Sequence, residues 1–179
     1  MFYVGQACGI IATLCCVFLP LFRKKWQMLL ATVLCNFFFL LNQIFIGTIG
    51  SACIIYVVAV TQSLIMLWHL RKDTPVSTAE NIIFLALYEG CGMLGFKRWL
   101  DILPLFGEVF NMLAAFQRDE QKSRWLILGN AVSWASYFLI EKLITGTLST
   151  NVFAELLAVC TTTAALIKYY LEKKKAAKE

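Results

Sequence analysis

The chain has 179 residues, of which 60% are apolar and only 15% are charged, and its mean hydropathy is +0.72. This composition excludes an ordinary water-soluble domain. The net charge of +5 does not indicate nucleic-acid binding, because Lys and Arg cap apolar segments and form no basic stripe. We expect these residues to contact membrane lipids, whose anionic headgroups attract them.

Seven apolar segments approach the roughly 20 residues that a helix needs to cross a bilayer. The predicted spans, in chain order, are 3–22, 26–46, 50–70, 81–97, 102–117, 125–144 and 151–171. The fourth and fifth are the shortest, and only a brief gap separates them. The sequence thus predicts an all-α, polytopic membrane protein with seven transmembrane helices.

The basic residues fall in every second gap between these spans. Twelve of the 16 Lys and Arg residues lie on one predicted face: Arg23, Lys24, Lys25, Arg71, Lys72, Arg118, Lys122, Arg124, Lys173, Lys174, Lys175 and Lys178. The opposite face has Lys97, Arg98 and Lys142. Because cytoplasmic loops accumulate Lys and Arg, we predict an N-terminus outside and a C-terminus in the cytoplasm.

The sequence offers no pattern typical of a cofactor site or an enzyme. All seven cysteines lie in predicted spans, their number is odd, and no CxxC pair occurs, which favours packing over disulfides or a metal site. The single histidine, His69, adjoins Arg71, and we expect it to be solvated at the membrane interface. Since neither a nucleotide-binding loop nor a nucleophile–base constellation is visible, we expect no enzymatic activity and no cofactor.

An internal repeat appears when the chain is shifted by 99 residues. The segment 26–73 then pairs with 125–172 without a gap; Trp26 meets Trp125, and Gly47-Thr48 meets Gly146-Thr147. The predicted organisation is a first three-helix unit at 1–72, a linker with the fourth span at 73–101, a second unit at 102–172 and a basic tail at 173–179. One intervening span makes the two units parallel, related by an axis along the membrane normal.

Three stretches carry a family resemblance over almost the whole chain. They are Arg23-Lys-Lys-Trp with Asn36-Phe-Phe-Phe-Leu-Leu, Ile102-Leu-Pro-Leu-Phe-Gly107, and Gly146-Thr-Leu with Glu155. The chain resembles the YgjV-type bacterial inner membrane proteins, which implies a location in the bacterial cytoplasmic membrane. Its three-one-three plan is also similar to that of SWEET, PQ-loop and PnuC-type carriers, and this likeness implies transport only at the level of the fold.

Three carboxylates are predicted at membrane depth: Glu89, Glu108 and Glu155. An ionisable group there costs about 2.5–3.5 kcal/mol at a helix centre, so it usually faces a bundle interior or a watery cavity. Glu108 and Asn111 are three residues apart and share one helix face. Each acid is a candidate for solute binding or proton coupling, or else a packing residue.

Other polar side chains in the spans are candidates to read a polar solute. Asn36 and Gln62 lie in the second and third spans, and a stripe of Asn130, Ser133, Trp134 and Tyr137 lies in the sixth. A Trp face beside amides suits a sugar or a heterocycle. The alternative is that these groups serve only as interhelical hydrogen bonds and bulk packing.

Two functions remain open from the sequence. The first is a small-solute transporter, for a sugar- or vitamin-like solute, working by alternating access or facilitated diffusion. Its predicted midplane pocket is bordered by Asn36, Gln62, Glu108, Asn111, Asn130 and Trp134. The second is a non-transporting membrane protein such as a sensor, sorting receptor or assembly factor. Amino-acid cargo and a homo-oligomer are also open.

Overall fold

The computed structural model describes residues 1–47, 51–94, 96–146 and 151–176, and these form seven α-helices and no strands. The helices are α1 Phe2–Phe18, α2 Lys25–Ile46, α3 Ser51–Lys72, α4 Thr78–Leu94, α5 Ile102–Phe116, α6 Glu120–Thr145 and α7 Asn151–Ala176. Short 3₁₀ turns, Leu19–Leu21 and Trp99–Asp101, follow α1 and precede α5. Thr48, Thr147 and Lys178 lie outside the described residues. The all-α prediction is confirmed.

The helix ends follow local sequence signals. Gly47 and Gly146 end α2 and α6 in the left-handed conformation, with φ values of 83° and 74°. The Asp119 side chain caps α6 by accepting a hydrogen bond from the Lys122 N–H at 2.8 Å. Pro20 lies in the turn that ends the first apolar segment. The two left-handed glycines are 99 residues apart, so the helix ends agree with the predicted repeat.

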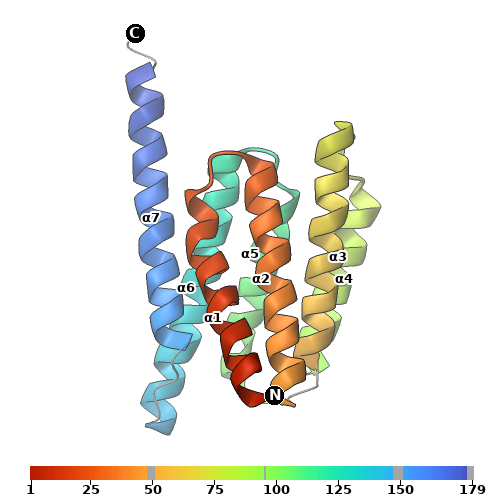
Figure 1. Ribbon diagram of the computed structural model, residues 1–179, viewed down its shortest axis with the longest axis vertical. Coiled ribbons are helices and arrows are strands. Elements are labelled where there is room, and N and C mark those ends of the chain that lie inside the picture. Colours follow the sequence, from red (N-terminus) through yellow and green to blue (C-terminus); the bar gives the residue numbers. More distant parts are fainter. Residues whose placement is uncertain (48–50, 95, 147–150, 177–179) are drawn as a thin grey trace.

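Five of the helical segments are long and apolar enough to cross a membrane: Phe2–Leu21, Lys25–Ile46, Cys53–Lys72, Trp99–Phe116 and Val152–Lys175. The other two helices are α4, which has 17 residues, and α6, which carries charged residues at both ends and the polar stripe between them. Both run along the bundle beside the other helices (Figure 1). The seven-span arrangement therefore stays a prediction.

The helices pack in an order that has the same form in both halves. α2 packs against α1 and α3, α6 packs against α5 and α7, and α4 joins α3 to α5. The two halves also touch through α1 with α7 and α3 with α5. The two halves thus share one helix order, and the duplication with a linker helix stays a prediction.

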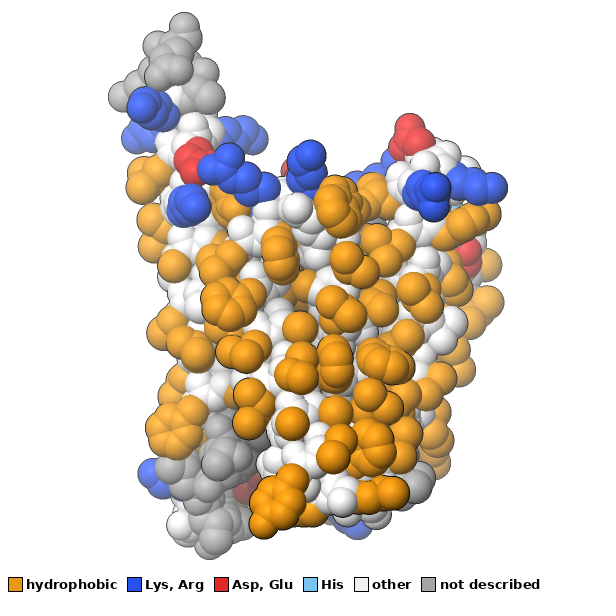
Figure 2. All heavy atoms as spheres, in the orientation of Figure 1, with side chains coloured by type: hydrophobic (Ala, Val, Ile, Leu, Met, Phe, Trp, Pro, Cys, Tyr) orange, Lys and Arg blue, Asp and Glu red, His pale blue; other side chains and the backbone are white. Residues whose placement is uncertain are grey.

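Side-chain types are sorted along the length of the bundle. Large apolar side chains cover the middle of the visible face, and Lys and Arg gather mainly at one end (Figure 2). Exposed apolar residues occur on every helix, among them Ile10, Leu30, Leu64, Ile82 and Leu157. Such an extensive apolar surface is typical of a protein that faces lipid.

The expectation for His69 is wrong. Its side chain is buried, and its ring nitrogens lie 2.8 Å from Thr74 Oγ1 and 3.0 Å from Glu80 Oε1. The chain turns sharply between α3 and α4, and this turn brings both partners within hydrogen-bonding distance of the ring nitrogens. His69 thus ties the end of α3 to the start of α4. The seven cysteines are free thiols.

Candidate functional site

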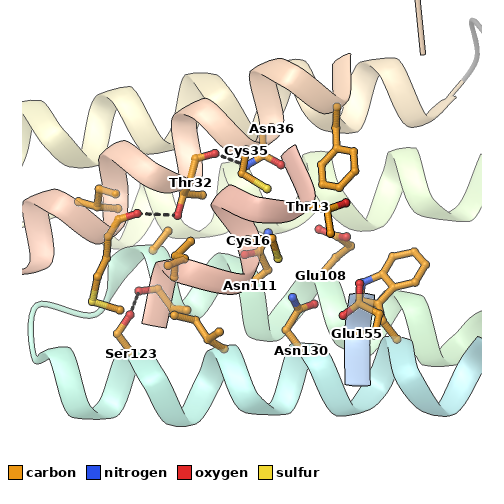
Figure 3. Close-up of a pocket in the computed structure, with 18 of the residues that line it drawn as sticks. Thr13, Cys16, Thr32, Cys35, Asn36, Glu108, Asn111, Ser123, Asn130 and Glu155 are labelled. Atoms are coloured by element: carbon orange, nitrogen blue, oxygen red, sulfur yellow. Dashed lines mark hydrogen bonds between the residues drawn. The ribbon is translucent and has the colours of Figure 1, made fainter. Parts of the chain in front are cut away.

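A cavity of about 220 Å³ lies between the two halves of the bundle. Side chains from six helices line it: Thr13 and Cys16 from α1, Asn36 from α2, Tyr56 from α3, Glu108 from α5, Asn130 from α6 and Glu155 from α7. Figure 3 shows carboxylate, amide, hydroxyl and thiol groups directed toward this space. Polar groups from both halves of the bundle therefore meet in one cavity, whose lining is otherwise apolar.

Five of the six predicted site residues line this cavity, namely Asn36, Glu108, Asn111, Asn130 and Trp134. Gln62 does not. It is buried between α3, α4 and α5, where its Oε1 accepts from Tyr88 Oη at 2.9 Å and its Nε2 donates to the Met112 carbonyl at 3.4 Å. Gln62 accordingly links three helices outside the cavity.

Two of the three predicted acids meet in the cavity. Glu108 comes from α5 and Glu155 from α7, and Asn111 lies three residues after Glu108 on α5. Among the described residues, no Lys, Arg or His forms an ion pair with either acid. Glu89 lies elsewhere on α4, and its buried Oε1 has no hydrogen-bond partner within the part of the chain that the structure describes. The cavity consequently presents two carboxylates to whatever enters it.

Gly107 makes room for the α6 side chains. A Cβ atom at this position would lie 3.0 Å from the Trp134 ring and 3.1 Å from Asn130 Oδ1. Asn130 Oδ1 is buried and has no hydrogen-bond partner among the described residues. A buried amide oxygen of this kind is costly unless water or a ligand satisfies it.

Aromatic rings cover the cavity at the level of Trp134. Trp134 stacks on Phe138 at a centroid distance of 5.7 Å, and Phe39 stacks on Tyr56 at 5.5 Å. All four rings line the cavity. Under the 99-residue shift Phe39 corresponds to Phe138, so each half contributes an equivalent ring.

The predicted polar stripe of α6 divides between two roles. Asn130 and Trp134 line the cavity, whereas Ser133 bonds back to the Gly129 carbonyl at 2.9 Å. Tyr137 accepts a hydrogen bond from Arg98 Nη2 at 3.1 Å and does not line the cavity. Side chains three or four residues apart are neighbours on a helix but need not face the same space. The predicted stripe therefore included two residues that do not line the cavity.

Several lining residues are not among those predicted, and Lys25 is the most unexpected. Its side chain is 6% exposed, and Nζ donates to the Ala114 carbonyl at 2.6 Å and to Ser123 Oγ at 2.9 Å. In the sequence, Lys25 belongs to a basic cluster that membrane topology alone explains, so the cluster does not mark it as a cavity residue. The repeat could have singled out Lys25, because it pairs this residue with Arg124, another buried cation 99 residues later.

Comparison with curated proteins and with solved structures found no significant match. A family model does match. The model for Imp-YgjV, described as a bacterial inner membrane protein, covers residues 3–173. With its apolar helices and nearly complete coverage by this model, the chain belongs to the Imp-YgjV family of bacterial inner membrane proteins.

Proposed function

We propose that this inner membrane protein carries a small polar solute through the cavity between its two halves. The observation that carries the proposal is a single cavity that combines carboxylates, amides and stacked aromatic rings from both halves of the bundle. Transporters built from repeated units place their sites at the interface between the units, near the bilayer midplane. The proposal assigns no chemical reaction to the cavity.

The lining favours a solute that offers both a flat or apolar face and hydrogen-bond donors. Trp134 and its neighbouring rings can stack on a sugar ring or a heterocycle, as in other small-molecule pockets. Glu108, Glu155 and Asn130 Oδ1 supply acceptors for hydroxyl or amino groups. Sugar- and vitamin-like compounds meet both requirements.

The helix order supports a three-one-three carrier that works by alternating access. In this mechanism the two three-helix units rock against each other around the cavity. The units are 1–72 and 102–172, and α4 links them. A solute crosses by binding the cavity in one state of the carrier and leaving it in the other. Without coupling to a second gradient, this movement is facilitated diffusion.

The proposal is tested by thermal unfolding of the detergent-purified protein against sugars, nucleosides, vitamins and amino acids. A solute that binds only the folded state raises the unfolding temperature by mass action. We expect a dose-dependent shift that is lost in Asn130→Ala and Trp134→Ala. Trp99→Ala is the matched control, because Trp99 is 70% exposed and lies outside the cavity, and it should keep the shift.

A panel that gives no shift at millimolar concentration would contradict the proposal. It would favour a sensor or assembly role with a protein or lipid partner. A shift that survives in both cavity variants would place solute binding elsewhere on the protein.

A further inference from the structure

Two buried cations at the basic end of the bundle make reciprocal contacts between the halves: Lys25, which lines the cavity, and Arg124, which adjoins the lining residue Ser123. Lys25 begins α2 and reaches the Ala114 carbonyl near the end of α5. Arg124 lies near the start of α6 and reaches the end of the first helical segment, where Nε donates to the Pro20 carbonyl at 2.9 Å and Nη2 to the Phe22 carbonyl at 2.6 Å. Each half therefore holds the first helix of the other.

The two cations occupy equivalent positions under the predicted repeat. Lys25 and Arg124 are 99 residues apart, the same shift that pairs Trp26 with Trp125. α1 and α5 are the first helices of their units, and the carbonyls that accept the hydrogen bonds belong to their last turns or the residues just after them. Carbonyls at helix C-termini lack intrahelical donors and attract cations.

Both cations are almost fully withdrawn from solvent. Lys25 is 6% exposed and Arg124 is 2% exposed, whereas Lys24 and Lys122 beside them are exposed. The Arg124 guanidinium also lies 4.0 Å from the centre of the Tyr169 ring, and Tyr169 Oη donates to the Leu21 carbonyl at 2.7 Å. A buried cation is stable only while such partners are present.

An apolar layer lies one helical turn deeper. Met28, which is 1% exposed, forms a buried cluster with Leu19 and Ala31, and Ile127 packs against this cluster. Met28 and Ile127 are again 99 residues apart, and both line the cavity. Two layers of repeat-related side chains, one charged and one apolar, thus lie at the basic end, and Lys25, Met28 and Ile127 of these layers line the cavity.

We propose that Lys25 and Arg124 are gating residues that close the basic end of the cavity in this conformation. Opening that end requires each cation to leave the carbonyls of the opposite half and enter water at the membrane surface. Because both contacts span the two halves, they break together when the halves rock apart. The gate deepens the proposed transport function, on which its biological role rests, but its closure is measurable without any solute.

A native thiol reports on this gate. Cys35 lines the cavity, is 7% exposed, and lies ten residues beyond Lys25 on α2, about 15 Å along the helix. In a background with the other six cysteines replaced by alanine, a membrane-impermeant maleimide is applied to membrane vesicles of both orientations. Labelling of Cys35 from the basic end then measures opening of that end.

We expect slow labelling from the basic end in this background. Lys25→Ala and Arg124→Ala should each raise the rate by about tenfold or more, since each removes charge-assisted hydrogen bonds that hold the closed state. Labelling from the opposite end should not rise. Lys122→Ala, which removes an exposed cation two residues from Arg124, is the matched control and should leave both rates unchanged.

Arg124→Lys is a second, milder variant at the same position, for the case that Arg124→Ala fails to fold. Lysine keeps the positive charge but lacks the planar fork that reaches two carbonyls, so a smaller increase in labelling from the basic end is expected. Unchanged labelling in Lys25→Ala, Arg124→Ala and Arg124→Lys, or an equal increase from both ends, would contradict the proposed gate. If labelling changes as expected but no solute shifts the unfolding temperature, the gate is supported and the transport proposal is contradicted.

Discussion

Single residues decide the shape of the cavity, and Gly107 is the clearest case. The spacing of polar residues predicted five of the lining side chains, because an amide or carboxylate at membrane depth must face a polar space or a partner. Gln62 meets the same condition through partners on α4 and α5. Sequence alone cannot separate these two ways of satisfying a buried amide, since each depends on neighbours distant in the chain.

Gly107→Ala is expected to disturb both packing and solute binding. The new methyl group would lie 3.0 Å from the Trp134 ring, and overpacking of this kind costs about 1–3 kcal/mol. The free energy of unfolding in detergent should fall, and the solute-induced thermal shift should weaken. Gly90→Ala is the control, because a Cβ there meets nothing within 4 Å and alanine favours the helix. Equal stability of the two variants would contradict the predicted role of Gly107.

Glu108→Gln separates solute binding from proton coupling. Glutamine keeps the shape of the side chain and its capacity to hydrogen-bond, but it cannot bind and release a proton. For facilitated diffusion we expect a normal transport rate in the variant and equal wild-type rates with and without a proton gradient. Gradient-driven uptake that disappears in Glu108→Gln would instead establish proton coupling through this residue.

At the scale of elements, the sequence predicted seven helices with bounds close to those observed. The predicted span at 102–117 corresponds to α5 at Ile102–Phe116, and the one at 26–46 to α2 at Lys25–Ile46. The larger differences occur at α6 and α7, which extend beyond the apolar core into charged residues. Hydropathy detects the part of a helix in lipid, whereas its end depends on caps such as Asp119 and Gly146.

The start of α4 shows how such a cap couples to pH. The Ser77 N–H donates to Glu80 Oε2 at 2.7 Å, the Glu80 N–H donates to Ser77 Oγ at 3.1 Å, and His69 contacts the same carboxylate. Glu80 precedes the predicted span at 81–97. The Ser77 N–H, followed by His69, lowers the pKa of Glu80 from its ordinary value.

A lowered pKa in the folded protein contributes stability above the unfolded pKa of about 4.3, and this is lost as the pH falls through the folded value. The stability difference between wild type and Glu80→Gln should therefore be constant at neutral pH and shrink in acid. Thermal unfolding of both proteins across this range measures it. If the stability curves of the two proteins stay parallel down to the lowest pH, the charge of Glu80 makes no contribution to stability.

At the scale of the whole molecule, the sequence indicated a duplication that the helix order supports. The repeat-related pairs are spread through the bundle: Lys25 with Arg124 at the basic end, Phe39 with Phe138 in the cavity, and Gly47 with Gly146 at the far helix ends. The cavity itself was less predictable, because it forms where helices distant in the chain meet, such as α1 and α7, and no local signal encodes such contacts.

The charged ends of the bundle predict its orientation in the membrane. The chain termini lie at opposite ends, and the C-terminus shares the basic end (Figures 1 and 2). Since Lys and Arg are retained in the cytoplasm, a fluorescent protein fused to the C-terminus should fluoresce, and an export-dependent phosphatase fused there should be inactive. The reverse result would place the basic end, and with it the proposed gate, outside the cell.

Uptake of labelled solutes by liposomes containing the purified protein tests the central claim most directly. The compounds are those that shift the unfolding temperature, together with representative sugars and vitamins. We predict uptake that saturates with solute concentration, falls strongly in Trp134→Ala and is unchanged in Trp99→Ala. Uptake no faster than in empty liposomes across the whole set would contradict a carrier.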